Sequence, residues 1–196
     1  MRPYLSVVVK PTLYCNTGCR HCYHTPAERV KGEIPLDTLD RLFRMVSEEY
    51  EAAWFIWHGG EPLTLPMSFY KNVIEMQERY FGKNNGRCGN TVQTNGTLIN
   101  RRFMAYCREK MINVGVSYEG PYNSVLREGD PSKALDLLSA KENKYSVSAT
   151  ISAETALKQR ELYDHFKNQP LAFACHSRRM RQEQRDRPRC RRVHQG

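Results

Sequence analysis

The feature that most constrains the fold is a repeat in which a short apolar segment is followed by an amphipathic helical segment. Apolar runs predict strands at 5–9, 53–57, 91–93, 114–117 and 146–151, and a sixth that begins at 171–174. Helical spacing predicts helices at about 34–50, 66–81, 133–141 and 154–166, and one more after a cap at Asn100. Alternating strands and helices are typical of parallel strands joined by right-handed crossovers. The repeat therefore predicts an α/β fold, a partial TIM-like (β/α)6 barrel of parallel strands, truncated near strand six.

The repeat stops where the composition changes, near residue 174. Most of the net charge of +9 lies in residues 177–196, which hold eight arginines and two acidic residues. This segment has few apolar residues to bury, so we interpret 175–196 as a solvated, disordered tail and 1–174 as the folded domain. Nucleic-acid binding by the tail is the weaker interpretation, because no aromatic residues are interleaved with the arginines.

The rest of the composition indicates a protein of a reducing compartment. The apolar run at 5–9 is too short for a signal peptide, and no segment approaches the roughly 20 apolar residues of a membrane span. Seven cysteines, an odd number with three of them clustered, fit a metal site better than a disulfide framework. We therefore expect a cytoplasmic protein that does not associate with a membrane.

The clustered cysteines are Cys15, Cys19 and Cys22, in the run CNTGCRHCYH. A 4Fe–4S cluster normally takes four thiolates, so three cysteines would leave one iron open to a small molecule. A structural zinc site is the alternative, with His21 or His24 as the fourth ligand. The cysteine spacing alone leaves both possibilities open.

Further polar or glycine-rich motifs follow the next predicted strands. They are His58-Gly59-Gly60-Glu61-Pro62, Thr94-Asn95-Gly96 and Ser117-Tyr118-Glu119-Gly120-Pro121. In barrels of parallel strands, function gathers at the carboxyl ends of the strands. The cysteine loop and these three motifs all fall at those ends, in four consecutive units. We therefore expect one shared site there, and this convergence favours the iron–sulfur cluster over zinc.

These motifs, in this order, resemble the radical S-adenosylmethionine (SAM) enzymes. Within them, the chain is similar to the branch of the anaerobic sulfatase-maturating enzymes and related SPASM-type peptide maturases, over about residues 5–151. The resemblance implies a 4Fe–4S cluster whose open iron binds SAM and cleaves it reductively. The products would be methionine and a 5′-deoxyadenosyl radical that abstracts hydrogen. It further implies a peptide or protein substrate, and a reduced flavodoxin or ferredoxin as electron donor.

The resemblance also assigns roles to individual residues. Gly59 and Gly60 would permit close backbone approach to SAM, and Glu61 would offer a carboxylate to its ammonium group. Ser117 and Arg127 would contact the ribose and the methionine carboxylate, because a guanidinium can pair with both carboxylate oxygens. No residue is nominated as the catalytic acid or base.

Other residues receive structural or secondary roles. His21 occupies a position where the superfamily often has an aromatic residue near the adenine, and Asn95 is expected to organise its turn. Where the family usually has aspartate, this chain has Glu119. His24 and His58 are interpreted as hydrogen-bonding loop residues, and Cys107 as a packed core thiol.

The resemblance does not extend to the C-terminus. Peptide maturases of this branch generally carry a cysteine-rich extension for auxiliary clusters, whereas only Cys175 and Cys190 follow Cys107 here. This difference favours a truncated or frame-shifted end. The alternative function is therefore a noncatalytic fragment of such an enzyme that binds a cluster or zinc.

Overall fold

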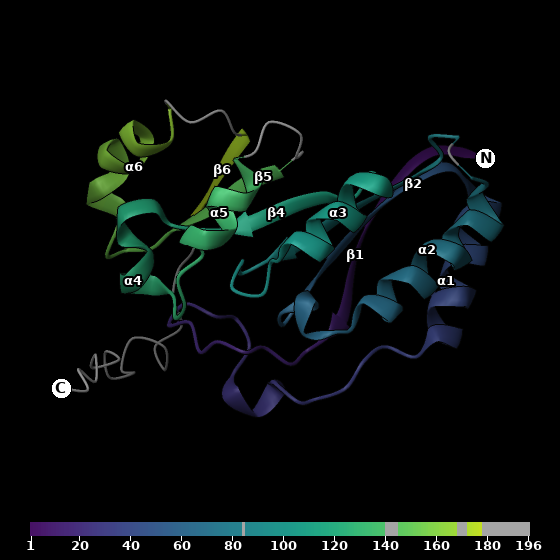
Figure 1. Ribbon diagram of the computed structural model, residues 1–196, viewed down its shortest axis with the longest axis horizontal. Coiled ribbons are helices and arrows are strands. Elements are labelled where there is room, and N and C mark those ends of the chain that lie inside the picture. The colour runs from purple at the N-terminus through teal and green to yellow at the C-terminus, as the bar shows by residue number, and fades with distance from the viewer. Residues whose placement is uncertain (84, 140–144, 168–171, 178–196) are drawn as a thin grey trace.

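The computed structural model describes residues 1–83, 85–139, 145–167 and 172–177, and its centre is a parallel sheet of six strands (Figure 1). The strands neighbour one another in chain order and all pairs are parallel. They are β1 (Arg2–Thr12), β2 (Tyr50–Gly59), β3 (Cys88–Thr94), β4 (Asn113–Ser117), β5 (Tyr145–Ile151) and β6 (Ala172–Ser177). This order is that of the wall of a parallel barrel, so the predicted fold class is confirmed.

The helices follow the strands as the repeat predicts. They are α1 (Leu36–Glu49), α2 (Met67–Phe81), α3 (Arg101–Glu109), α4 (Asn123–Leu126), α5 (Ser132–Leu138) and α6 (Gln159–Phe166). Four single 3₁₀ turns accompany them: η1 (Pro26–Glu28), η2 (Pro62–Thr64), η3 (Gly120–Tyr122) and η4 (Ala156–Lys158).

Three details of the helix prediction were wrong. The residues after the motif at 117–121 predict a polar connection, but the short helix α4 lies in that segment. The helix predicted at 154–166 is divided into η4 and α6. The sequence favours Ser132 as the cap of the helix predicted at 133–141, but Ser132 is the first residue of α5. Its backbone N–H and its hydroxyl both donate to the carboxylate of Asp130 at 2.9 Å.

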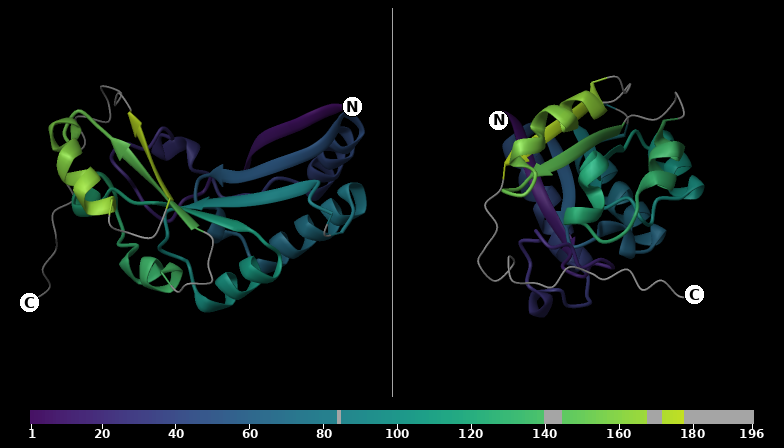
Figure 2. Two further views of the ribbon diagram at one scale, coloured as in Figure 1. Left: turned by 90° about the horizontal axis from the view of Figure 1, so that it is seen from above. Right: turned by 90° about the vertical axis from the view of Figure 1, so that its left-hand side faces the viewer.

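Alternation along the strands divides the sheet into two faces. Phe55 and Trp57 of β2 are buried on one face, in a core cluster with residues of α1 and α2. These two helices lie together along that side of the sheet (Figures 1 and 2). The rings of Phe43 and Phe55 meet edge to face with their centroids 5.0 Å apart. Cys107 of α3 is also buried in this core, which raises the pKa of its thiol to about 12. Its predicted role as a packed core thiol is confirmed.

The opposite face of the sheet is more polar. Trp54 Nε1 donates to Thr91 Oγ1 at 2.8 Å, and Gln93 Nε2 donates to Ser117 Oγ at 3.0 Å. The indole of Trp54 lies so close over Gly89 that a Cβ there would be 2.2 Å from its Cε3. This face therefore offers hydrogen-bonding groups beside the carboxyl ends of β3 and β4.

The cap of α3 provides a direct test of the predicted helix start. Asn100 Oδ1 accepts a hydrogen bond from the backbone N–H of Phe103 at 3.0 Å, as the sequence predicts. We expect Asn100→Ala to lower the free energy of unfolding by about 1 kcal/mol, and the melting temperature by about 2–4 °C. Thermal unfolding of the apoprotein would measure this. An unchanged melting temperature would mean that the cap contributes nothing to stability.

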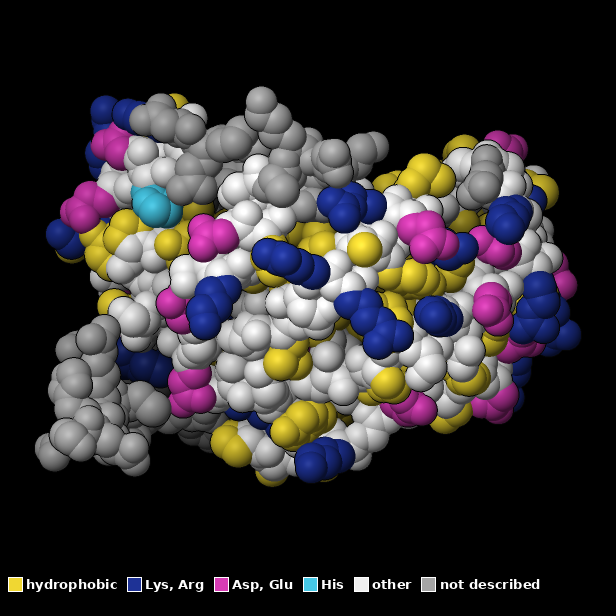
Figure 3. Space-filling view, in the orientation of Figure 1, with side chains coloured by type: hydrophobic (Ala, Val, Ile, Leu, Met, Phe, Trp, Pro, Cys, Tyr) yellow, Lys and Arg dark blue, Asp and Glu magenta, His cyan; other side chains and the backbone are white. Residues whose placement is uncertain are grey.

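Two further features concern the predicted domain boundary and the charged surface of the molecule. β6 continues to Ser177, three residues past the domain boundary predicted at 174, while 178–196 lie outside the described residues. Positive and negative side chains are interspersed over the face that carries α2 and α3 (Figure 3). Within the described residues, every helix is too short or too polar to cross a membrane.

Candidate functional site

The loop that carries the three cysteines follows β1 and reaches across to α4 (Figure 1). The carbonyl of Leu126 in α4 accepts from the backbone N–H of Arg20 at 3.0 Å and lies 3.1 Å from His21 Nδ1. Gly18 N–H donates to Glu128 Oε2 at 2.6 Å, and Arg20 pairs with Glu154 at 3.0 Å. Residues that follow β4 and β5 therefore hold the cysteine loop in place.

Gly59, the last residue of β2, and Gly60, which follows it, allow the loop after β2 to pack closely against the backbone at Thr12 and Tyr14. Gly60 N–H donates to Thr12 O at 3.0 Å, and Glu61 N–H donates to Tyr14 O at 2.8 Å. A Cβ on Gly60 would lie 2.0 Å from Tyr14 O, so only glycine fits there. Gly59 has φ +109°, which also favours glycine. The glycines thus permit a close approach between the β2 loop and the residues just before Cys15, while the close approach to SAM expected of them stays a prediction.

Glu61 was expected to face the ammonium group of SAM, but the structure gives its carboxylate other partners. It is 1% exposed. Its Oε1 accepts from Leu63 N–H at 2.9 Å and from Thr94 Oγ1 at 2.6 Å, and its Oε2 accepts from Asn95 N–H at 2.7 Å. Burial raises the pKa of Glu61, although these hydrogen bonds oppose the shift. Glu61 therefore joins the loops after β2 and β3 and does not line the cavity.

A cavity of about 320 Å³ lies at the carboxyl ends of the strands. Seven of the eight predicted site residues line it: Cys15, Cys19, Cys22, Gly59, Gly60, Ser117 and Arg127. Residues without a predicted cofactor role also line it: Thr17, Tyr23, His58, Gln93, Thr94, Asn95, Ser148 and Thr150. The alternation of Ser146, Ser148 and Thr150 along β5 is a sequence signal that could have identified the last two. His21 also lines the cavity.

Arg127 is held by a buried carboxylate. Its Nε donates to Glu119 Oε2 at 2.5 Å, and Glu119 is fully buried. Glu119 Oε1 accepts from the backbone N–H of Thr150 at 3.2 Å. Burial opposes the charge of Arg127, but the attraction and hydrogen bond of Glu119, together with the interaction with Cys19, outweigh burial, and the pKa of the guanidinium is raised. Glu119 thus links the ends of β4 and β5 and fixes the only cationic guanidinium that lines this cavity among the described residues.

His58 makes the loop hydrogen bond that was predicted for it. Its Nδ1 accepts from Gly59 N–H at 2.7 Å. Burial lowers the pKa of His58, and the nearby positive charges of Lys10 and Arg127 lower it further. The neutral ring therefore stabilises the glycine turn. Tyr23 lies beside it and donates from its hydroxyl to Gly59 O at 3.2 Å.

The donor set of the cysteine loop suits an iron–sulfur cluster. The sulfurs of Cys15 and Cys19 both lie near Thr17 Oγ1, at 3.3 and 3.6 Å, so their side chains turn to the same side of the loop. Within the described residues, no three His, Cys, Asp or Glu side chains converge on a point where one ion could sit. A cubane cluster does not require such convergence, because each thiolate binds a different iron.

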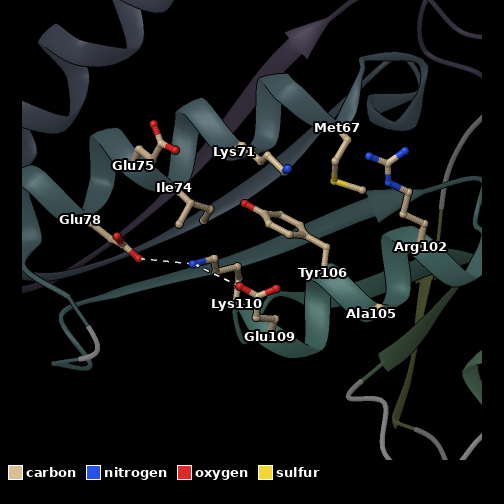
Figure 4. Close-up of a pocket in the computed structure, with 10 residues that line it drawn as sticks. All are labelled: Met67, Lys71, Ile74, Glu75, Glu78, Arg102, Ala105, Tyr106, Glu109 and Lys110. Carbon is tan, nitrogen blue, oxygen red and sulfur yellow. Dashed lines mark ion pairs between the residues drawn. The ribbon is translucent and has the colours of Figure 1, made fainter.

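A second cavity, of about 450 Å³, lies outside the sheet between α2 and α3 (Figure 4). Its lining is a mixture of apolar and oppositely charged side chains. Lys110 Nζ lies 3.6 Å from a Glu109 carboxylate oxygen and 4.0 Å from one of Glu78, so these charges pair with one another. This cavity is larger than the first, but the thiols and the other residues predicted to bind cofactors line the first one.

Comparisons with known proteins identify the family of the chain. A sequence profile of the radical SAM superfamily matches residues 9–153. The serine-type anaerobic sulfatase-maturating enzyme of Bacteroides thetaiotaomicron is 32% identical in an alignment of 182 positions that covers 83% of this chain and 43% of the relative. The cysteine-type enzyme of Clostridium perfringens is 27% identical over 87% of this chain and 50% of its own length. The chain thus spans about half the length of the curated relatives it matches.

Solved structures show the same fold. The structure of native anSMEcpe with bound AdoMet (SAM) matches with a TM-score of 0.78 and 22% identity, over 89% of this chain and 51% of that one. Streptococcus suis SuiB bound to the precursor peptide SuiA matches with a TM-score of 0.66 and 19% identity, over 90% and 39%. The chain thus shares its fold with about half or less of each of these solved chains.

The profile match covers most of the chain and includes the three cysteines and the motifs after β2 to β4. The family resemblance expected from those motifs is confirmed, and a 4Fe–4S cluster and SAM are the cofactors of that family. The chain belongs to the radical SAM superfamily.

Proposed function

We propose that Cys15, Cys19 and Cys22 bind a 4Fe–4S cluster and that the adjoining cavity binds SAM. The observation that carries this proposal is the gathering of seven predicted residues, from the ends of the three strands β1, β2 and β4, around one cavity. Three thiols line that cavity, and Arg127 approaches it from the loop after β4. Thiolates are the usual protein ligands of iron–sulfur clusters, and a guanidinium is suited to a carboxylate.

The chain supplies position and charge, while the cofactors supply reactivity. When bound, a reduced cluster can cleave SAM to methionine and a 5′-deoxyadenosyl radical. Gly59 and Gly60 let the loop after β2 pack against the backbone that leads into Cys15, and Ser117 offers a hydroxyl held by Gln93. Arg127, oriented by Glu119, would pair with the methionine carboxylate. The neutral ring of His58 adds no charge to a site that would hold a sulfonium.

The proposed substrate is a peptide or a protein. Curated relatives are named as sulfatase-maturating enzymes, and solved neighbours are described with bound peptides. The polar face of the sheet, with Trp54 and Gln93, adjoins the cavity and offers both ring surface and hydrogen-bonding groups. A reduced flavodoxin or ferredoxin is the proposed electron donor, and the cytoplasm the proposed location.

The test is anaerobic reconstitution with iron and sulfide, followed by dithionite and SAM, with mass-spectrometric detection of 5′-deoxyadenosine. We expect about four irons per chain and product formation. In the triple variant Cys15→Ala, Cys19→Ala, Cys22→Ala, both should fall to background. Cys88→Ala is the matched control, because Cys88 lies in β3 at the end far from the cavity and should retain both.

Each other outcome has a definite meaning. A cluster without 5′-deoxyadenosine would favour the alternative, a noncatalytic cluster-binding fragment. Zinc bound in preference to iron by the same three cysteines would overturn the proposal.

A further inference from the structure

One hydroxyl stands between two of the cysteine sulfurs. Thr17 Oγ1 is 3.3 Å from Cys15 Sγ and 3.6 Å from Cys19 Sγ. Both distances are within hydrogen-bonding range for sulfur. Thr17 lies between the two cysteines in the sequence, so a movement of the loop carries all three residues together.

The direction of this hydrogen bond follows from the chemistry of the groups. A thiol can donate or accept, but a thiolate that binds iron has no proton to give. A threonine hydroxyl has a single proton and two lone pairs. When the cysteines bind a cluster, Thr17 can therefore interact with Cys15 or Cys19 only as the donor.

The side-chain amide of Asn95 donates to Thr17 Oγ1 and so occupies one acceptor position of that hydroxyl. Its Nδ2 lies 3.4 Å from Thr17 Oγ1 and 3.9 Å from Cys15 Sγ, and it donates to Asn16 Oδ1 at 3.0 Å. Its Oδ1 accepts from both the N–H and the hydroxyl of Thr97, at 3.0 and 2.7 Å, which fixes the orientation of the amide. An N–H group pointed at Thr17 Oγ1 directs the threonine proton away from Asn95 and toward the sulfurs.

We propose that Thr17, oriented by Asn95, is a positioning residue that raises the reduction potential of the cluster by donating a hydrogen bond to a ligating cysteine sulfur. This inference rests on the proposed function, since it requires the cluster. Reduction adds one electron, supplied by the external donor, and so increases the negative charge on the thiolates. A donor at the sulfur stabilises that added charge, and hydrogen bonds to sulfur are among the factors that set cluster potentials.

The test is a redox titration of the reconstituted protein with dithionite, followed by electron paramagnetic resonance. Thr17→Val removes the hydroxyl and keeps the branched shape. We expect it to retain iron and sulfide but to be about tenfold harder to reduce, which corresponds to a potential about 59 mV more negative for one electron. Thr17→Ser keeps the donor and should restore most of the difference.

Thr91→Val is the matched control, because its hydroxyl accepts from Trp54 Nε1 and is not among the groups near the sulfurs. Its potential should equal that of the wild type. If Thr17→Val assembles too little cluster, Thr17→Ala is titrated in its place. A potential unchanged in Thr17→Val, or equally lowered in Thr17→Ser, would overturn the inference while leaving the wild-type cluster and its 5′-deoxyadenosine intact. Failure of the wild type itself to assemble a cluster would overturn the proposed function and this inference together.

Discussion

Replacing Gly60 with alanine is expected to prevent assembly of the site. The new Cβ would lie 2.0 Å from Tyr14 O and 2.6 Å from Leu13 O, and both obstacles are backbone. Backbone cannot rotate away as a side chain can, so the residues that lead into Cys15 must shift. The hydrogen bonds of Gly60 and Glu61 to Thr12 and Tyr14 would be broken by that shift.

We expect Gly60→Ala to lower the free energy of unfolding by about 3 kcal/mol and the melting temperature by about 6–12 °C. Iron bound after reconstitution should fall to the level of the triple cysteine variant. Thermal unfolding of the apoprotein and iron analysis measure the two effects separately.

Gly115→Ala is the matched control for this substitution. A Cβ there would also be too close to a neighbour, 2.1 Å from Gln93 Oε1, but that atom is the end of a flexible side chain. Gln93 can move, so Gly115→Ala should retain iron and lose little stability. Equal losses in the two variants would contradict the explanation that backbone contact makes Gly60 necessary.

The fold could be predicted from the sequence because its signals are local and repeated. Strands β1 to β5 each contain an apolar or β-branched run, and Asn100 is a standard cap for α3. The position of α4 could not be predicted, because NSVL has no helical repeat of its own. This helix ends at Leu126, whose carbonyl accepts from the cysteine loop, so its formation depends on a contact distant in sequence.

The candidate site was predictable where a residue type has one dominant use. Clustered thiols and paired glycines have few alternative explanations, and both line the cavity. Carboxylates are less specific. Glu61 and Glu119 follow β2 and β4 in equivalent positions, yet one fixes backbone N–H groups and the other a guanidinium. Only the partners that folding brings to each carboxylate distinguish these roles.

Glu61→Gln is expected to loosen the loop after β3 and, through it, the cysteine loop. The carboxylate accepts three hydrogen bonds, from Leu63, Thr94 and Asn95. A glutamine has one oxygen and one NH₂ group, so at least one buried backbone N–H would face another donor. Such an unsatisfied group costs about 1–3 kcal/mol. Because Asn95 also contacts Asn16 and Thr17, we expect slower iron uptake and faster iron loss in addition to lower stability.

The stability lost in Glu61→Gln should depend on pH, and this dependence distinguishes Glu61 from an ordinary surface carboxylate. Its pKa is raised by burial, so the folded protein holds this proton more tightly than the unfolded chain does. The contribution of Glu61 to stability is therefore fully present below the usual glutamate pKa of about 4.3. It declines as the pH rises through the raised value. Since the glutamine that replaces Glu61 does not titrate, the deficit of Glu61→Gln should be largest at acidic pH and smaller near neutrality.

Urea unfolding of the apoprotein at several pH values would measure this difference. Glu75→Gln on the exposed side of α2 is the matched control, since it removes one carboxylate without removing a buried acceptor. A deficit that grows toward neutral pH would show that the hydrogen bonds of Glu61 outweigh its desolvation. That result would mean that folding lowers the pKa of Glu61 instead of raising it. The carboxylate would still join the loops after β2 and β3. Equal stability of Glu61→Gln and the wild type at all pH values would remove that role as well.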